Sequence, residues 1–238
     1  MKKSTLIIAG TVVLGVALLV WGSVQTSSGT NTTDPDVAKD ILVIREDDWV
    51  RGATSTSELA LYEYSDFQCP ACRAYEPILA EIMTEFGSRI SLVYRHFPLK
   101  SIHFNANQAA MASEAAGLQG KFFEMHGLLF SEQSVWSSLS SEEMKAKVLE
   151  FATTLDLDVV KFESDLSSSQ IAEVVSADLA DGQSLGVNST PSFFLGGKKL
   201  SNPQSLEEFR LVLLEALGDL TIESEAVSTS TSGVEIVK

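Results

Sequence analysis

The only two cysteines of this 238-residue chain, Cys69 and Cys72, are three positions apart, between a predicted strand and a predicted helix. Side chains that alternate between two faces predict the strand, Leu59–Phe67, and an apolar stripe at helical spacing predicts the helix, Arg73–Phe86. Two cysteines are too few for a small fold held by several disulfides, or for a four-cysteine zinc or iron–sulfur site. The chain must therefore fold around a hydrophobic core, for which its length is sufficient.

The position of the cysteine pair indicates redox chemistry. A thiol at a helix N-terminus meets unpaired backbone N–H groups and the positive end of the helix dipole, which stabilise the thiolate that attacks disulfides. We therefore expect Cys69 to be the exposed nucleophile and Cys72 to be the buried, resolving thiol. The alternatives are an inert disulfide, two buried thiols or half of a zinc site. Zinc is disfavoured because the three histidines, His96, His103 and His126, are scattered.

The rest of the central region predicts a single α/β domain with an insertion. Short strands flank the cysteine-bearing unit, a long stretch has helical periodicity, and a Gly-Gly turn joins two late strands before a final helix. The order is β-β-α-β, a helical block, then β-β-α. Besides the strand and helix named above, we predict strands at Ile41–Ile44, Ile90–Phe97, Ser192–Leu195 and Lys198–Leu200, helices from about 104 to 185, and a helix at Ser205–Leu217.

The N-terminal segment is apolar and follows two lysines. Residues 6–21 are apolar except for Gly and Thr, so residues 1–24 are predicted to form a transmembrane anchor, with a cleaved export signal as the alternative. Residues 25–35 are predicted to be a flexible tether and residues 219–238 a flexible acidic tail. We expect the folded domain, 36–218, on the extracytoplasmic side of the cell membrane, where disulfides persist.

Charge and composition exclude some partners. The net charge of −15, from 17 basic and 32 acidic residues, argues against nucleic acid, because phosphate binding needs a basic surface. A cysteine pair carries electrons by itself, so we expect no cofactor and no metal. The sequence has no evident dimerisation region, so we expect a monomer.

Residues 61–72, Leu-Tyr-Glu-Tyr-Ser-Asp-Phe-Gln-Cys-Pro-Ala-Cys, resemble the active-site strand and helix entry of the thioredoxin-fold family, and within it the DsbA-like thiol–disulfide oxidoreductases. Pro77 falls where thioredoxin-like proteins carry a proline that kinks the first helix. The helical block resembles the helical domain that DsbA-like proteins insert into the thioredoxin core, here at about 101–185. The resemblance covers about residues 36–218 and implies an α/β thioredoxin fold with an inserted helical domain.

The resemblance also implies roles for residues around the cysteines. A cis bond between Thr190 and Pro191 would present the Thr190 backbone to an extended substrate and keep other thiols and metal ligands away from Cys69. Glu63 would be a buried carboxylate with a raised pKa that relays a proton to or from Cys72. The alternative for Glu63 is an edge-strand glutamate that faces water.

Three further residues are expected to meet a substrate. Pro70 and Ala71 lie between the cysteines, and Phe67 is expected at the rim, with core packing as its alternative. Strongly oxidising DsbA-like proteins often have a histidine where this chain has Ala71. Because alanine cannot stabilise a thiolate by hydrogen bonding or charge, we expect a milder oxidant.

The function that the resemblance implies is the introduction of disulfide bonds into exported, cysteine-containing proteins through Cys69 and Cys72. A quinone-linked, DsbB-like or vitamin K epoxide reductase-like membrane protein would reoxidise the pair. One alternative is the same site acting as a disulfide reductase or isomerase. The other is a non-catalytic, redox-sensing binding module at the membrane.

Overall fold

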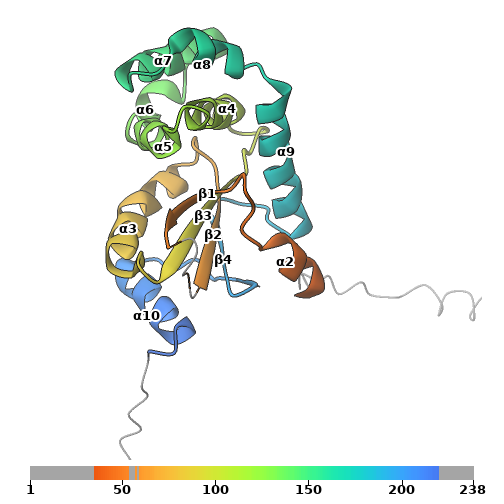
Figure 1. Ribbon diagram of the computed structural model, residues 1–238, viewed down its shortest axis with the longest axis vertical. Helices are drawn as coiled ribbons and strands as arrows, with labels where there is room; N and C mark the ends of the chain where they lie inside the picture. Colours follow the sequence, from red (N-terminus) through yellow and green to blue (C-terminus); the bar gives the residue numbers. More distant parts are fainter. Residues whose placement is uncertain (1–34, 54–56, 58, 220–238) are drawn as a thin grey trace, which may run out of the picture. The chain divides into compact units, whose positions relative to one another are not determined.

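The computed structural model describes residues 35–53, 57 and 59–219, arranged around a five-stranded mixed sheet (Figure 1). The strand order is β1-β3-β2-β4-β5, in which β2 and β3 are parallel and the other neighbours are antiparallel. Strand β2, which leads to the cysteines, therefore lies at the centre of the sheet. The strands are β1 (Trp49–Gly52), β2 (Leu59–Ser65), β3 (Ile90–His96), β4 (Ser192–Leu195) and β5 (Lys198–Lys199).

Helices cover both faces of the sheet (Figure 1). On one face, α3 and α10 pack together over an apolar cluster that includes Leu61 and Phe193. On the other face, α2 and α9 flank a second cluster, around Tyr64 and Phe97. These four helices are α2 (Pro35–Ile41), α3 (Pro70–Phe86), α9 (Ser169–Ser184) and α10 (Leu206–Ala216).

Between β3 and β4 the chain forms the predicted helical block, which covers the end of the sheet that carries the cysteines (Figure 1). Ser140 and Glu143 form the capping box at the start of α7, and the Asp158 side chain caps α8. These caps satisfy N–H groups that a helix leaves unpaired. Besides α9, the block contains α4 (Ala106–Gly117), α5 (Phe122–Ser131), α6 (Gln133–Trp136), α7 (Ser141–Thr154) and α8 (Val159–Asp165).

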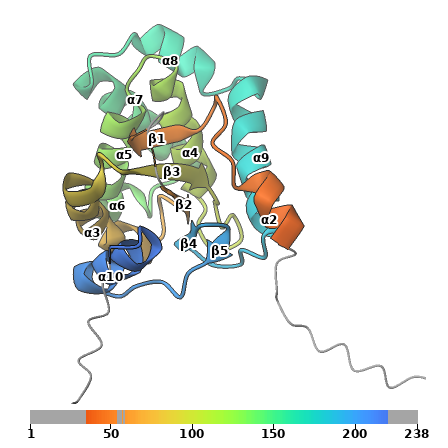
Figure 2. The ribbon, with the colours of Figure 1, turned by 60° about the horizontal axis from the view of Figure 1, so that its bottom comes forward.

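The predicted hairpin after the helical block is confirmed. Gly196 and Gly197 both have positive φ, 55° and 79°, and they join β4 to the short edge strand β5 (Figure 2). Such backbone angles suit glycine because it has no Cβ. The hairpin places β4 directly beside β2, so the residues just before β4 lie close to the end of β2.

The prediction of a strand at Ile41–Ile44 is wrong. Helix α2 ends at Ile41, and the next residues have no regular structure. Their carbonyl groups are bound by a side chain: the Arg95 guanidinium donates to the Ile41 oxygen at 2.9 Å and to the Val43 oxygen at 2.8 Å. The first strand is instead β1, which pairs with β3. Periodicity cannot discriminate between structures for an apolar run of four residues.

The predicted membrane anchor, residues 1–24, lies outside the described residues. Nearly all of the predicted tether (25–35) and tail (219–238) lie outside them as well. Within the described ranges, no helix combines the length and the hydrophobicity that a membrane span requires.

Candidate active site

Cys69 and Cys72 occupy the start of α3, at the point where the chain leaves the central strand. Cys69 is the N-cap residue, with extended backbone angles (φ −74°, ψ 120°), and Cys72 lies in the first turn. Both thiols are free. Cys72 is fully buried, whereas Cys69 keeps 8% of its surface exposed. The prediction that Cys69 is exposed is therefore wrong. The helical block covers this end of the helix and leaves only a small part of Cys69 accessible.

A glutamine of the helical block holds this cover in place. The Gln133 side-chain amide, on α6, donates to the carbonyl oxygens of Phe67 at 2.7 Å and Cys69 at 3.0 Å. Gln68, which directly precedes Cys69, makes a contact in the opposite direction: its side-chain amide donates to the Ser137 carbonyl oxygen at 2.8 Å. Sequence reasoning missed both glutamines, because an amide between apolar residues gives no pattern that predicts such a contact.

The two thiols differ sharply in acidity. The pKa of Cys69 is lowered from 9 to about 5, chiefly by a hydrogen bond from the Cys72 thiol. Burial opposes this effect, while the Thr190 side chain and the backbone N–H groups of Ala71 and Cys72 add to it. Burial raises the pKa of Cys72 well above its ordinary value. The pair therefore favours a Cys69 thiolate beside a protonated Cys72.

Glu63 lies on β2 and is 1% exposed, which excludes the alternative of an edge glutamate in water. Burial is the main reason why its pKa rises to about 8, and the Glu76 carboxylate is the next. The negative charge of Glu63 contributes in turn to the raised pKa of Cys72. Glu63 is thus a buried carboxyl group that is largely protonated at neutral pH and lies close to the buried thiol.

The loop before β4 completes the site. The Thr190–Pro191 peptide bond is cis, as the resemblance implies. The Cys69 thiol lies 3.3 Å from the Thr190 carbonyl oxygen, to which it donates when protonated. Pro191 itself is buried. Cys69 and Thr190, 121 positions apart in sequence, therefore meet because β4 pairs with β2.

The three other residues predicted to meet a substrate divide into two groups. Pro70 and Ala71 are exposed in the first turn of α3, where a substrate chain has access to them. Phe67 is 1% exposed and its ring packs against Tyr94 and Phe130, with centroids 5.3 and 5.0 Å apart. Its position in the core corrects the prediction that it lines the rim.

The Asp66 carboxylate organises the loop that precedes Cys69, a role that sequence reasoning did not assign. Asp66 accepts hydrogen bonds from the backbone N–H groups of Gln68 at 2.7 Å and Leu99 at 2.8 Å. Its second oxygen also lies 2.8 Å from Nδ1 of His103. The cysteine loop is thereby joined to the loop that follows β3. Within the part of the chain that the structure describes, no group of three His, Cys, Asp or Glu side chains is arranged to bind a metal.

The chain matches a known protein family and is similar to several solved structures. Residues 45–215 match the protein family described as Thioredoxin. The structure is similar to that of Wolbachia pipientis alpha-DsbA1, with 20% identity and a TM-score of 0.67 over 76% of this chain and 96% of that one. It is also similar to oxidised BdbD from Bacillus subtilis, with 18% identity and a TM-score of 0.63 over 71% and 92%. At these identities the solved structures establish the fold.

Curated relatives are similar over one portion of their length. The Na(+)/H(+) antiporter NhaA 3 of Salinispora tropica is 33% identical over 178 residues, which are 75% of this chain and 26% of the antiporter. NhaA 1 of Salinispora arenicola is 36% identical over 169 residues, 71% of this chain and 24% of the antiporter. The chain thus spans about a quarter of the length of the curated relatives it matches.

Proposed function

This chain belongs to the thioredoxin family, and from that premise we propose that it is a DsbA-like thiol–disulfide oxidoreductase that introduces disulfide bonds into exported proteins. The observation that carries the proposal is the contrast within the cysteine pair. The pKa of Cys69 is about 5, while that of Cys72 lies well above its ordinary value. A stabilised Cys69 thiolate favours the reduced pair, and a pair that favours its reduced form is an oxidant.

The proposed reaction begins with the Cys69–Cys72 disulfide. A substrate thiolate attacks Cys69 Sγ, the intramolecular disulfide breaks, and Cys72 leaves and takes up a proton. A second substrate thiolate then attacks the substrate sulfur of the mixed disulfide, and Cys69 leaves as a thiolate. Its low pKa makes it a good leaving group in this step. The substrate loses two electrons and the cysteine pair gains them.

The surroundings of Cys69 favour the binding of an extended substrate segment. Pro70 and Ala71 are exposed beside it, and the Thr190 backbone lies at its sulfur. We assign these three residues to substrate contact, in the manner of a peptide that pairs with a strand. Pro191 is assigned the role of holding Thr190 in place.

The cellular setting is proposed from the N-terminal sequence and from the similar proteins. Residues 1–24 would anchor the chain in the cell membrane, with the catalytic domain outside the cytoplasm. The reduced pair would pass its electrons to a quinone-linked, DsbB-like or vitamin K epoxide reductase-like membrane protein. Transport of ions is not part of the proposal, because the match to the antiporters covers only about a quarter of their length.

The activity is tested with reduced, unfolded ribonuclease A, whose enzymatic activity reports disulfide formation. The oxidised protein is expected to accelerate the recovery of that activity, and Cys69→Ser is expected to abolish the acceleration. Cys72→Ser should instead accumulate mixed disulfides through Cys69. If the wild-type protein leaves the folding rate of ribonuclease A unchanged, catalysis is excluded. The remaining hypothesis is then the non-catalytic, redox-sensing binding module.

The direction of electron flow is tested by the reduction potential of the cysteine pair, equilibrated against glutathione. We expect a value of about −120 to −180 mV, the range of known protein oxidants. Ala71 should place it toward the milder end, since it offers the thiolate no side-chain hydrogen bond. A potential near roughly −270 mV, like that of thioredoxin, would instead favour a reductase.

A further inference from the structure

A hollow that is open to solvent lies at the end of the sheet opposite to the cysteines. It has a volume of about 490 Å³ and is bounded by α2 and by the β4–β5 hairpin. Leu59, the first residue of β2, lies in its wall, whereas the cysteine loop follows Ser65, the last residue of that strand. These two ends are about 20 Å apart along the strand. Figure 2 shows the hairpin between α10 and α2.

The hollow combines an apolar wall with two lysines. Ala38 and Leu42, from the α2 side, and Tyr62 of β2 supply apolar surface. Lys39 comes from α2 and Lys198 from β5, and both side chains are exposed. The described residues that line the hollow include no carboxylate. Such a surface suits an amphiphile that has an anionic head group.

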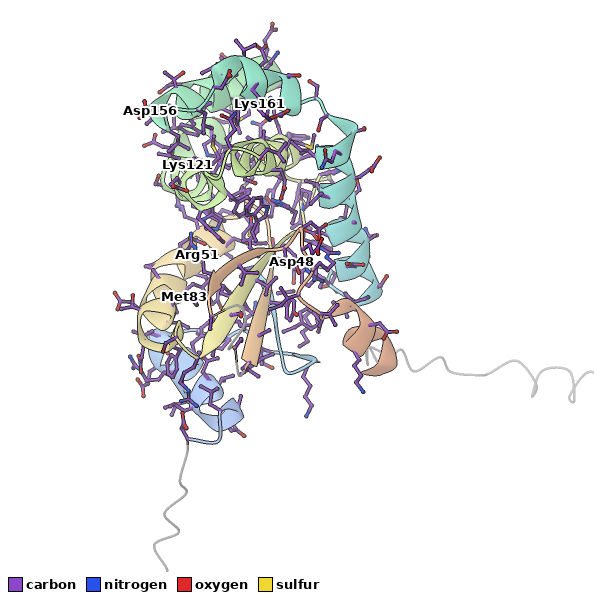
Figure 3. The ribbon with its side chains drawn as sticks, in the orientation of Figure 1. Asp48, Arg51, Met83, Lys121, Asp156 and Lys161 are labelled. Carbon is purple, nitrogen blue, oxygen red and sulfur yellow. The ribbon has the colours of Figure 1, made fainter. Side chains whose placement is uncertain are left out.

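These lysines differ from the lysines of the helical block, which are all neutralised by carboxylates. The block lysines with an ion pair are Lys121, Lys145, Lys147 and Lys161. Figure 3 shows that Lys121 and Lys161 lie in the block, away from α2. Within the described part of the chain, Lys39, Lys198 and the adjoining Lys199 form no ion pair. Their charge is therefore available to an anion from outside the molecule.

The net charge of the chain makes this face the one that can approach an anionic surface. At a net charge of −15, most of the molecule is repelled by such a surface, and a local group of unpaired lysines determines the orientation. Lysines on an edge strand also prevent pairing with other sheets, which would explain Lys198 and Lys199 by themselves. Lys39 lies on a helix and has no strand edge to protect.

The position of α2 in the chain favours a membrane as the source of the amphiphile. Helix α2 begins at Pro35, the first residue that the structure describes. In the setting proposed above, residues 1–24 anchor the chain in the membrane, so only residues 25–34 separate the anchor from α2. An extended chain of about ten residues spans at most about 35 Å. The hollow therefore borders the described helix that follows the anchor most directly.

We propose that this hollow and its three lysines, Lys39, Lys198 and Lys199, dock the domain on the anionic phospholipids of the membrane that holds the anchor. The lysines bind the phosphate groups, and the apolar wall accepts the adjoining apolar part of a lipid. The inference rests on the membrane setting of the proposed function and is independent of its redox chemistry. Docking by this face directs the cysteines away from the bilayer, toward exported chains, so reoxidation by a membrane protein requires release.

The test measures lysine accessibility in the full chain, reconstituted into phosphatidylcholine vesicles with or without phosphatidylglycerol. A membrane-impermeant reagent acetylates exposed lysines, and mass spectrometry gives the rate at each position. One lysine near an anionic surface strengthens binding about fivefold. With three, we expect acetylation of Lys39, Lys198 and Lys199 to slow at least about fivefold in the anionic vesicles. High salt should remove the protection, because ions screen the attraction.

The chain provides an internal control and a matched variant. Lys100 is exposed at the cysteine end of the sheet and is expected to react equally in both kinds of vesicle. The double variant Lys198→Gln/Lys199→Gln should weaken docking about 25-fold and remove the protection of Lys39. The double variant Lys145→Gln/Lys161→Gln removes the same charge from the helical block, where both side chains are 49% exposed, and should dock like wild type. Exchange with glutathione in detergent checks that each variant is folded.

The outcomes keep the two hypotheses apart. Equal acetylation of Lys39, Lys198 and Lys199 in neutral and anionic vesicles overturns the docking surface. Equal slowing at Lys100 overturns it as well, because the bilayer would then shield the domain without a preferred face. A wild-type chain that does not float with neutral vesicles contradicts the proposed anchor, and one that forms no mixed disulfide with glutathione contradicts the oxidoreductase. In both cases the acetylation pattern with anionic vesicles still confirms or overturns the docking surface.

Discussion

At the scale of single residues, the acidity of Cys69 comes mainly from its partner thiol. The Cys72 hydrogen bond is the largest cause of the lowered pKa, ahead of Thr190 and the backbone N–H groups of Ala71 and Cys72. Position 71 contributes a backbone donor but no side-chain donor, since it is alanine. The chain thus reaches a low pKa through the geometry of the helix start, with no imidazole beside the sulfur.

This ranking predicts different effects for two replacements of Cys72. Cys72→Ala removes the donor and is expected to raise the pKa of Cys69 by about one to two pH units, since a hydrogen bond to a charged group contributes about 1.5–3 kcal/mol. Cys72→Ser keeps a hydroxyl donor and is expected to retain most of the effect. Absorbance of the thiolate at increasing pH measures both variants. Equal pKa values in the two variants would show that the backbone and Thr190 suffice.

At the scale of elements, a buried ion pair joins the segment before β1 to the sheet. Arg95 on β3 donates from Nε and Nη2 to the two carboxylate oxygens of Asp48, both at 2.9 Å. The two side chains are 0% and 1% exposed. The same guanidinium binds the carbonyl oxygens of Ile41 and Val43. A single arginine thereby orders the stretch where a strand had been predicted.

Removal of Asp48 should leave the buried Arg95 with only the more distant and partly exposed Asp181 carboxylate, 3.8 Å away. Asp48→Asn is expected to lower the free energy of unfolding by about 3–5 kcal/mol, the usual effect of breaking a buried pair. Asp47→Asn is the matched control: its side chain is 50% exposed and lies 3.4 Å from Arg45, so we expect a change within about 0.5 kcal/mol. Urea denaturation measures both. A loss below about 1 kcal/mol for Asp48→Asn would show that the carbonyl contacts and Asp181 together hold Arg95.

At the scale of the whole molecule, the elements that could be predicted were those with a local signal. Strand β2 and helix α3 follow from periodicity, the capping box at Ser140 from two residues, and the turn at Gly196 from glycine chemistry. The placement of Cys69 and Cys72 at a helix start follows from the same local signals.

The features that sequence could not predict depend on contacts between distant segments. Cys69 is buried because the helical block folds back over the start of α3. For the same reason Phe67 lies in the core and not at the rim. Glu76 was recognisable only as a residue four positions after Cys72. Its contact with His126, whose other ring nitrogen faces Arg51, depends on α5 and β1, which come from opposite sides of α3 in sequence.

For the whole molecule, the titrating residues of the active site should make the free energy of unfolding depend on pH. Because the pKa of Glu63 rises from 4.5 to about 8 on folding, the folded state binds its proton more tightly, and this contribution to stability is lost as the pH rises through that window. Glu76 acts in the same direction, from 4.5 to about 7. The pKa of Cys69 falls from 9 to about 5, so its contribution to stability grows as the pH rises from about 5 to 9.

These opposite contributions coexist only in the dithiol form, because a disulfide has no thiol to titrate. We therefore expect the disulfide form to lose stability between pH 5 and 8 more steeply than the dithiol form, by at most about 1.4 kcal/mol per pH unit. Denaturant unfolding of both redox forms at several pH values measures the difference, and Glu63→Gln should flatten the curve of the disulfide form. Parallel curves for the two redox forms would mean that Cys69 keeps an ordinary pKa in the folded protein, and the case for an oxidant would lose its main support.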